Sequence, residues 1–109
     1  MQPITFFKRL SYGLITGGLF MASLNTYAID CPPAKVLNLQ PQRSSILVKL
    51  QGQDWHRVGR PDHPGVKAMY SALLAAQMAG KKVTIRYPDG YDCKAYELST
   101  DAHMVRTHN

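Results

Sequence analysis

The side chains suited to acid–base, nucleophilic or metal chemistry are few and form no recognisable pattern. The four histidines are His56, His63, His103 and His108. No two of them have the four-residue spacing of a helical metal site, and the chain has no His-Glu-x-x-His segment. A Gly-x-Ser-x-Gly nucleophile elbow is also absent, and Glu97 is the only glutamate. The sequence therefore predicts no catalytic residues, no metal site and no cofactor, in a protein that is not an enzyme.

Residues suited to binding lie beside two polar turns. Trp55 follows the turn at residues 51–54 and is flanked by His56 and Arg57, while Tyr91 follows Asp89-Gly90. Sugars suit such surroundings, because their C–H faces stack on aromatic rings and their hydroxyls take hydrogen bonds. The alternative is that these rings belong to the core or to hairpins, and we expect Tyr91 to be the most exposed. The predicted ligand-binding residues are Trp55, His56, Arg57, Asp89 and Tyr91.

The two cysteines, Cys31 and Cys93, predict one disulfide. An even pair of cysteines in an exported chain is typical of a disulfide. A bond between these two closes a loop of about 60 residues, which in the chain-entropy description stabilises the fold by roughly 4 kcal/mol. The alternative, a metal held by two free thiols, lacks the paired spacing of zinc sites.

The first 28 residues have the features of a cleaved signal peptide. Lys8 and Arg9 precede an apolar run at residues 10–24, and Thr26-Tyr27-Ala28 offers small side chains at a cleavage site. The apolar run is shorter than the roughly 20 residues of a membrane-spanning helix. We therefore expect no membrane span, cleavage after Ala28, and a single domain at residues 29–109 that is secreted or periplasmic.

The elements predicted in this domain are short strands around one helix. Period-two alternation at 82–87 places Val83, Ile85 and Tyr87 on one face of a strand. Apolar residues at three- and four-residue spacing predict a helix at 64–79, with His63 or Asp62 near its cap and Gly80 at its left-handed end. The other predicted strands are 35–39, 45–50, 55–58, 93–98 and a short one at 102–106. This order predicts an α+β domain whose antiparallel sheet of five or six short strands curls into a partial barrel, with one four-turn helix packed on it.

The outer side of the predicted helix carries unusually little charge. Between residues 64 and 79 only Lys67 is charged. A helix without a charged outer face is often covered on a second side, which indicates contact with another copy of the chain. The predicted oligomer interface is Ala68, Ala72, Ala75, Ala76 and Ala79.

A resemblance to a known family covers roughly residues 46–98, and its specific part is the segment 62–86, DHPGVKAMYSALLAAQMAGKKVTIR. It is similar to the helix-then-strand core of bacterial toxin B subunits in which five B chains carry one A chain, such as the subtilase cytotoxin and typhoid-type B subunits. The resemblance implies an OB-like barrel, a ring of five chains with helices at its centre, cell-surface glycan as ligand, and an enzymatic A-type partner. It implies glycan binding as a class and assigns no residue to the sugar.

Together these features predict an exported bacterial binding module that recognises cell-surface glycan as a homo-oligomer, with five chains expected. The alternative is a periplasmic OB-like domain that binds nucleic acid or another anionic ligand without catalysis. Net charge favours anionic partners, since losing Lys8 and Arg9 lowers the formal charge from +6 to +4 (6 − 2). Export and the scattered positions of Lys and Arg make nucleic acid the less favoured partner. The alternative reading of the positive charge is that it only keeps a small domain soluble.

Overall fold

The computed structural model describes residues 27–109. The predicted signal peptide, residues 1–28, lies outside the described residues except for Tyr27 and Ala28, so the signal peptide and its cleavage site stay predictions. Among residues 27–109, no helix combines the length and hydrophobicity that a bilayer crossing requires.

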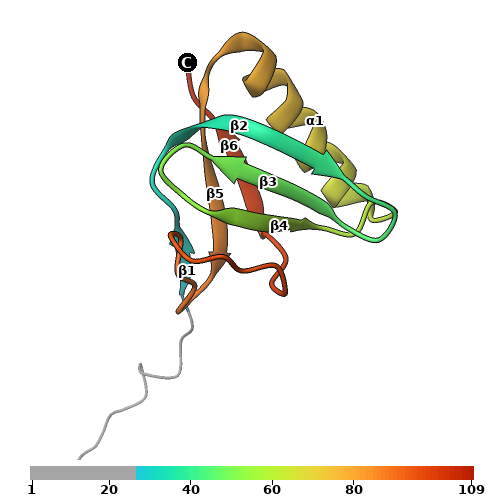
Figure 1. Ribbon diagram of the computed structural model, residues 1–109, viewed down its shortest axis with the longest axis vertical. Coiled ribbons are helices and arrows are strands. Elements are labelled where there is room, and N and C mark those ends of the chain that lie inside the picture. Colours follow the sequence, from blue (N-terminus) through green and yellow to red (C-terminus); the bar gives the residue numbers. More distant parts are fainter. Residues whose placement is uncertain (1–26) are drawn as a thin grey trace, which may run out of the picture.

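The described chain forms a curled antiparallel sheet with one helix packed on it, which confirms the predicted α+β class (Figure 1). The elements are β1 (Ala28–Asp30), β2 (Ala34–Pro41), β3 (Ile46–Leu50), β4 (Trp55–Gly59), α1 (Pro64–Ala79), β5 (Lys82–Pro88) and β6 (Met104–Thr107). The helix has the predicted bounds, and each strand predicted before residue 88 is present within two residues of its predicted ends.

Strand β5 is the centre of the sheet. Its first residues pair with β2, its last residues pair with β1, and β6 lies along its other edge. From β2 the sheet continues through β3 to β4, and β2–β4 cross the direction of β5 and β6 steeply in Figure 1. Register shifts occur between Val36 and Asn38 in β2 and between Ile46 and Leu47 in β3. Such bulges bend strands and increase their twist, which gives the sheet its curl.

The segment that leads to β6 lies along the free edge of β4. The N–H of Glu97 donates to the carbonyl of Trp55 at 3.3 Å, and the N–H of Ala102 donates to the carbonyl of Val58 at 3.0 Å. His56 and Glu97 form an isolated parallel bridge. The curled sheet is thereby partly closed between β4 and β6 by irregular chain.

Helix α1 begins and ends where its capping residues predict. The Nδ1 atom of His63 accepts the N–H of Gly65 at 3.0 Å, Pro64 occupies the first turn, and Gly80 has a left-handed φ of 68°. The helix buries Val66, Leu73 and Ala76 against the sheet.

The core lies between α1 and the inner face of the sheet. Val83, Ile85 and Tyr87 are all fully buried on that face, as their alternation predicts. Thr84 points the other way and is also buried, because His108 packs over it. The Thr84 hydroxyl lies 2.8 Å from Nε2 of His108, and the backbone N–H of His108 donates to the carbonyl of Lys82.

Two details of the predicted order are wrong. Residues 93–98 do not form a strand, because local turns occupy their polar groups: the N–H of Ala95 donates to the carbonyl of Asp92, and the Glu97 carboxylate accepts hydrogen bonds from Ser99 and Thr100. These hydrogen bonds hold the pKa of Glu97 below its usual range, and the bond from the Ser99 hydroxyl has the largest effect. Strand β1 was not predicted, since its three residues precede two prolines and pair only with the distant end of β5.

Candidate functional site

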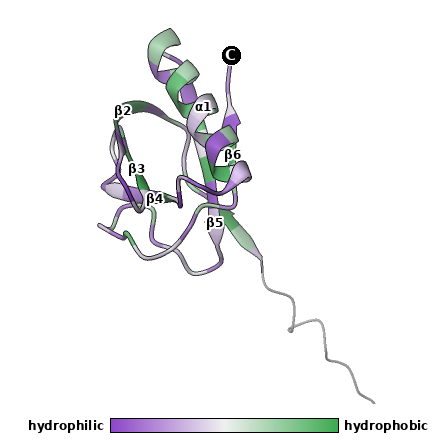
Figure 2. Cartoon of the chain, turned by 90° about the vertical axis from the view of Figure 1, so that its right-hand side faces the viewer, coloured by the Kyte–Doolittle hydropathy of each residue, from purple (hydrophilic) through white to green (hydrophobic). Residues whose placement is uncertain are grey.

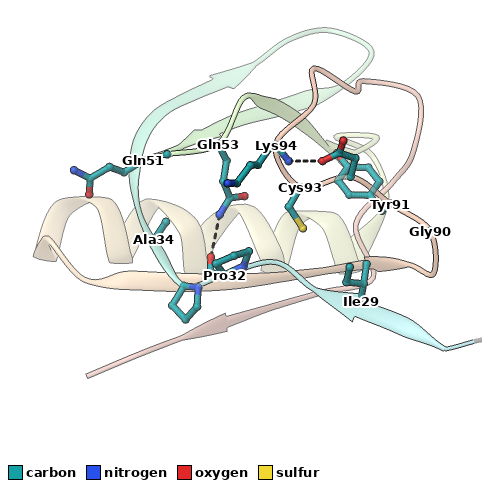
Figure 3. Close-up of a pocket in the computed structure, with 12 residues that line it drawn as sticks. Ile29, Pro32, Ala34, Gln51, Gln53, Gly90, Tyr91, Cys93 and Lys94 are labelled. Carbon is teal, nitrogen blue, oxygen red and sulfur yellow. Dashed lines mark hydrogen bonds between the residues drawn. The ribbon is translucent and has the colours of Figure 1, made fainter.

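The largest concavity described is a groove of about 710 Å³ beside the disulfide. Three segments line it, namely residues 29 and 32–34, residues 51–53 and residues 90–94 (Figure 3). We call this concavity the groove and these segments its three walls. A volume of this size falls within the range of roughly 300–1,000 Å³ that small-molecule sites occupy.

Two turns of the same kind shape two of the walls. The N–H of Gln53 donates to the carbonyl of Leu50 at 3.1 Å, and the N–H of Tyr91 donates to the carbonyl of Pro88 at 3.2 Å. The third position of each turn is a glycine with positive φ, 79° at Gly52 and 87° at Gly90. A type II turn requires this conformation at that position, which glycine adopts without a steric penalty. Pro88 occupies the first position of the later turn.

The disulfide joins the first wall to the third. Cys31 and Cys93 are bonded with their Cα atoms 5.5 Å apart, which confirms the predicted pairing. The first wall is tied to the second by the side-chain amide of Gln53, which donates to the carbonyl of Pro32 at 2.9 Å (Figure 3). A disulfide is typical of proteins that mature in an oxidising compartment, and it indicates that this chain matures outside the cytoplasm.

A fully buried histidine lies behind the groove. The Nε2 atom of His56 is 2.9 Å from the carbonyl of Cys93 and 3.3 Å from Oε1 of Gln53, and its Nδ1 atom is 2.6 Å from the hydroxyl of Tyr91. Both partners of Nε2 are acceptors, so the proton of the neutral ring lies on Nε2 and Tyr91 donates to Nδ1. Burial lowers the pKa of His56, against the opposing effects of the Cys93 carbonyl and of the charges on Asp54 and Glu97.

Two stacked tyrosines support this histidine. The rings of Tyr87 and Tyr91 lie parallel with their centroids 3.9 Å apart, and the His56 ring lies at an angle to both. The Tyr87 hydroxyl donates to the carbonyl of Arg57 at 2.7 Å. Burial raises the pKa of both phenols, so they are neutral hydrogen-bond donors near neutral pH.

The structure divides the predicted ligand-binding residues between two faces. His56 and Tyr91 meet in the buried cluster, and only Tyr91 of the five lines the groove. Trp55 and Arg57 point to the other side of β4, because successive residues of a strand alternate in direction, and Arg57 pairs with Asp101 at 2.6 Å. Asp89 is exposed in the turn. The expectation that Tyr91 is the most exposed ring is wrong, since it is only 8% exposed while Tyr96 is 65% exposed.

The other groove residues were not predicted from the sequence. Among them are Pro32, Pro33, Gln51, Gln53 and Lys94. Two features of the sequence mark these segments. The second and third walls each contain a turn glycine, and the first and third walls each contain or adjoin a cysteine. A disulfide requires its two chain segments to meet, so the predicted bond already places the first wall beside the third.

The predicted oligomer interface is only partly on the surface. Ala76 is buried in the core, so its assignment to the outer face is wrong, and Ala72 is half-buried. Ala68, Ala75 and Ala79 are exposed. The same side of α1 also carries Leu74 and Met78, which are 37% and 81% exposed. In Figure 2 the C-terminal end of α1 is accordingly coloured as apolar.

Charge on the described surface is mostly paired around arginines. Four ion pairs lie within residues 27–109: Arg57–Asp101, Arg60–Asp62, Arg86–Asp30 and Arg106–Asp30. Lysines are absent from these pairs. Lys35 and Lys82 are direct neighbours across β2 and β5 and both are exposed; like charges placed in this way repel each other. Within the same residues, no three His, Cys, Asp or Glu side chains are grouped so as to hold a metal ion.

Comparison of the chain with protein-family models, with curated proteins and with solved structures found no match. The resemblance to toxin B subunits therefore rests on the sequence alone, with its specific part at residues 62–86.

Proposed function

We propose that the chain is an exported, non-enzymatic binding module that recognises cell-surface glycan in the groove and acts as a homo-oligomer. The observation that carries this proposal is the mixed character of the groove lining. Pro32, Pro33 and Ile29 supply carbon surface, while Gln51, Asp92 and Lys94 supply amide, carboxylate and ammonium groups. A sugar presents the matching combination of C–H faces and hydroxyls.

Lys94 gives the groove a preference among sugars. It is exposed, lines the groove and takes part in none of the four ion pairs within residues 27–109. The Oδ1 atom of its neighbour Asp92 accepts the backbone N–H of Lys94 at 2.9 Å, which holds this carboxylate in the local turn. An ammonium group without a carboxylate partner suits an acidic sugar, so sialylated glycans are the expected ligands.

The ionisable groups of the groove support binding over catalysis. Those that line it are Tyr91, Asp92 and Lys94, and Cys93 is held in the disulfide. Tyr91 donates to His56 behind the wall, and Asp92 holds the local turn. A general acid or base must reach a substrate proton with a group that is free to exchange it, and the commitments of Tyr91 and Asp92 do not suit them to that task.

Lys94→Ala is expected to weaken binding to sialylated glycans about tenfold, because a hydrogen bond to a charged group contributes about 1.5–3 kcal/mol and 1.4 kcal/mol is a tenfold change. The measurement is a glycan array of neutral and sialylated sugars, followed by titration of the best ligand. Lys67→Ala is the matched control, since Lys67 is an exposed lysine on α1 outside the groove.

An array without binding above background would contradict the glycan proposal, as would equal losses for the two variants. Binding to single-stranded oligonucleotides with a steep dependence on salt would instead favour the alternative function.

The homo-oligomer is supported by the exposed apolar side of α1. Leu74, Ala75 and Met78 are exposed and uncharged on a helix that packs on the core through other residues. The resemblance implies five chains and an enzymatic A-type partner. Light scattering at tens of micromolar protein is expected to give a mass above that of a monomer, and Met78→Glu to reduce it. Lys81→Glu, beyond the helix end, is the control. A monomer of the unaltered protein would exclude the ring.

A further inference from the structure

The buried histidine is connected to the groove from behind. Its Nε2 atom faces Gln53 Oε1 of the second wall and the Cys93 carbonyl of the third wall, and its Nδ1 atom accepts from Tyr91, also of the third wall. Gln53 in turn donates to Pro32 of the first wall. We infer that His56 positions the three walls of the groove, and that protonation of His56 loosens them and makes ligand binding sensitive to acid.

The shortest hydrogen bonds around His56 suit the neutral ring. With its proton on Nε2, the ring donates toward two acceptors and accepts the Tyr91 hydroxyl, so each polar atom of the ring is satisfied. A second proton must go to Nδ1, where it meets the oxygen of Tyr91. The Tyr91 hydroxyl must then turn its own proton to the next acceptor, the carbonyl of Glu97, which lies at the longer distance of 3.3 Å.

The surroundings of His56 do not neutralise an added charge. The charged groups that face it are Asp54, Glu97 and Lys49, and no ion pair of His56 is present within residues 27–109. Asp54 accepts the N–H of Trp55, and the Glu97 carboxylate is saturated by Ser99 and Thr100. The remaining neighbours are the neutral rings of Tyr87 and Tyr91. The charges of Asp54 and Glu97 favour an imidazolium at this place, but neither carboxylate bonds to the ring, and the cost of burying the charge outweighs their effect.

The direction of the pH dependence follows from the lowered pKa of His56. Because the folded state takes up this proton less readily than the unfolded state, the unfolded state holds more protons below the ordinary histidine pKa of 6.5. The contribution of neutral His56 to folding stability is therefore fully present above about pH 6.5 and is lost as the pH falls below that value. The walls that His56 connects are the part of the fold that opens first.

The test uses amide hydrogen exchange of the oxidised protein, without ligand, at pH 7.5 and pH 5.0. After correction for intrinsic exchange rates, protection of residues 51–56 and 90–97 is expected to fall at least fivefold at the lower pH. Protection in α1 is expected to change less than twofold. A pH series by NMR gives the titration of the folded-state His56 ring, whose midpoint is expected below 6.5, and protection is expected to fall between pH 6.5 and that midpoint.

His56→Gln removes the titrating group and is expected to abolish the pH step, while His103→Gln, at an exposed histidine, leaves it unchanged. The inference is overturned by protection that does not change between the two pH values, or by a change that falls outside the interval between pH 6.5 and the midpoint of the His56 titration. Both readings come from the unaltered protein, so they stand even where His56→Gln fails to fold. The acid-sensitivity of ligand binding rests on the proposed function, but the exchange experiment needs no ligand, so either can fail without the other.

Discussion

Replacement of both cysteines, Cys31→Ala with Cys93→Ala, is expected to lower the free energy of unfolding by roughly 4 kcal/mol. The bond joins residues 62 positions apart, so its loss restores a large conformational freedom to the unfolded chain. A domain this small has a thin margin of stability, which makes the loss a large fraction of the total. Urea unfolding followed by circular dichroism at 222 nm measures the change.

Treatment of the unaltered protein with a reductant is expected to shift its urea midpoint toward that of the double variant, whose own midpoint does not respond to reductant. An unchanged midpoint, with complete reduction verified by mass spectrometry, would contradict this account of how the fold is stabilised.

Tyr87→Ala is expected to destabilise the protein by about 3–5 kcal/mol, as is usual when a fully buried aromatic ring is removed. The Tyr87 ring is completely buried, stacks on Tyr91 and adjoins His56, so its loss leaves a cavity beneath the polar cluster. Tyr87→Phe keeps the ring and loses the hydrogen bond to the Arg57 carbonyl, which contributes about 1 kcal/mol. Chemical unfolding of both variants gives the comparison.

A Phe variant as unstable as the Ala variant would show that the hydroxyl dominates over packing. An Ala variant within 1 kcal/mol of the unaltered protein would show that the cavity collapses at little expense, contrary to a tightly packed core.

Helix α1 and strand β5 could be predicted from the sequence because their patterns are local. The helix repeats its apolar residues over four turns and ends at Gly80, and β5 alternates over its whole length. A period of this kind reports on which face is buried without reference to the rest of the chain. The disulfide was equally accessible, since two cysteines allow a single pairing.

The missed features depend on chain segments that are distant in sequence. Strand β1 has three residues and exists because the end of β5 offers it a partner. The region 93–98 has apolar residues suited to a strand, but Asp92 accepts the backbone N–H groups of Lys94 and Ala95, and the Glu97 side chain accepts that of Ser99. Local side-chain hydrogen bonds of this kind compete with sheet pairing, and no periodicity reveals which will prevail.

The exposure of Tyr91 was predicted wrongly for a related reason. A residue just after a turn is usually near the surface, but the turn folds Tyr91 back onto Tyr87 and His56. The groove then forms where three separate walls converge, and two of its boundaries are set by the Cys31–Cys93 bond and by the Gln53–Pro32 hydrogen bond. Such a site is a property of tertiary contacts, and no single segment of the sequence encodes it.

The central place of β5 also determines when the chain can fold. It pairs with β2, with β1 from the first described residues, and with β6, which ends at Thr107. Sheets made of such remote pairings form slowly, because the connecting chain must be ordered before the contacts reward it. The sheet around β5 is therefore complete only after β6 has been synthesised.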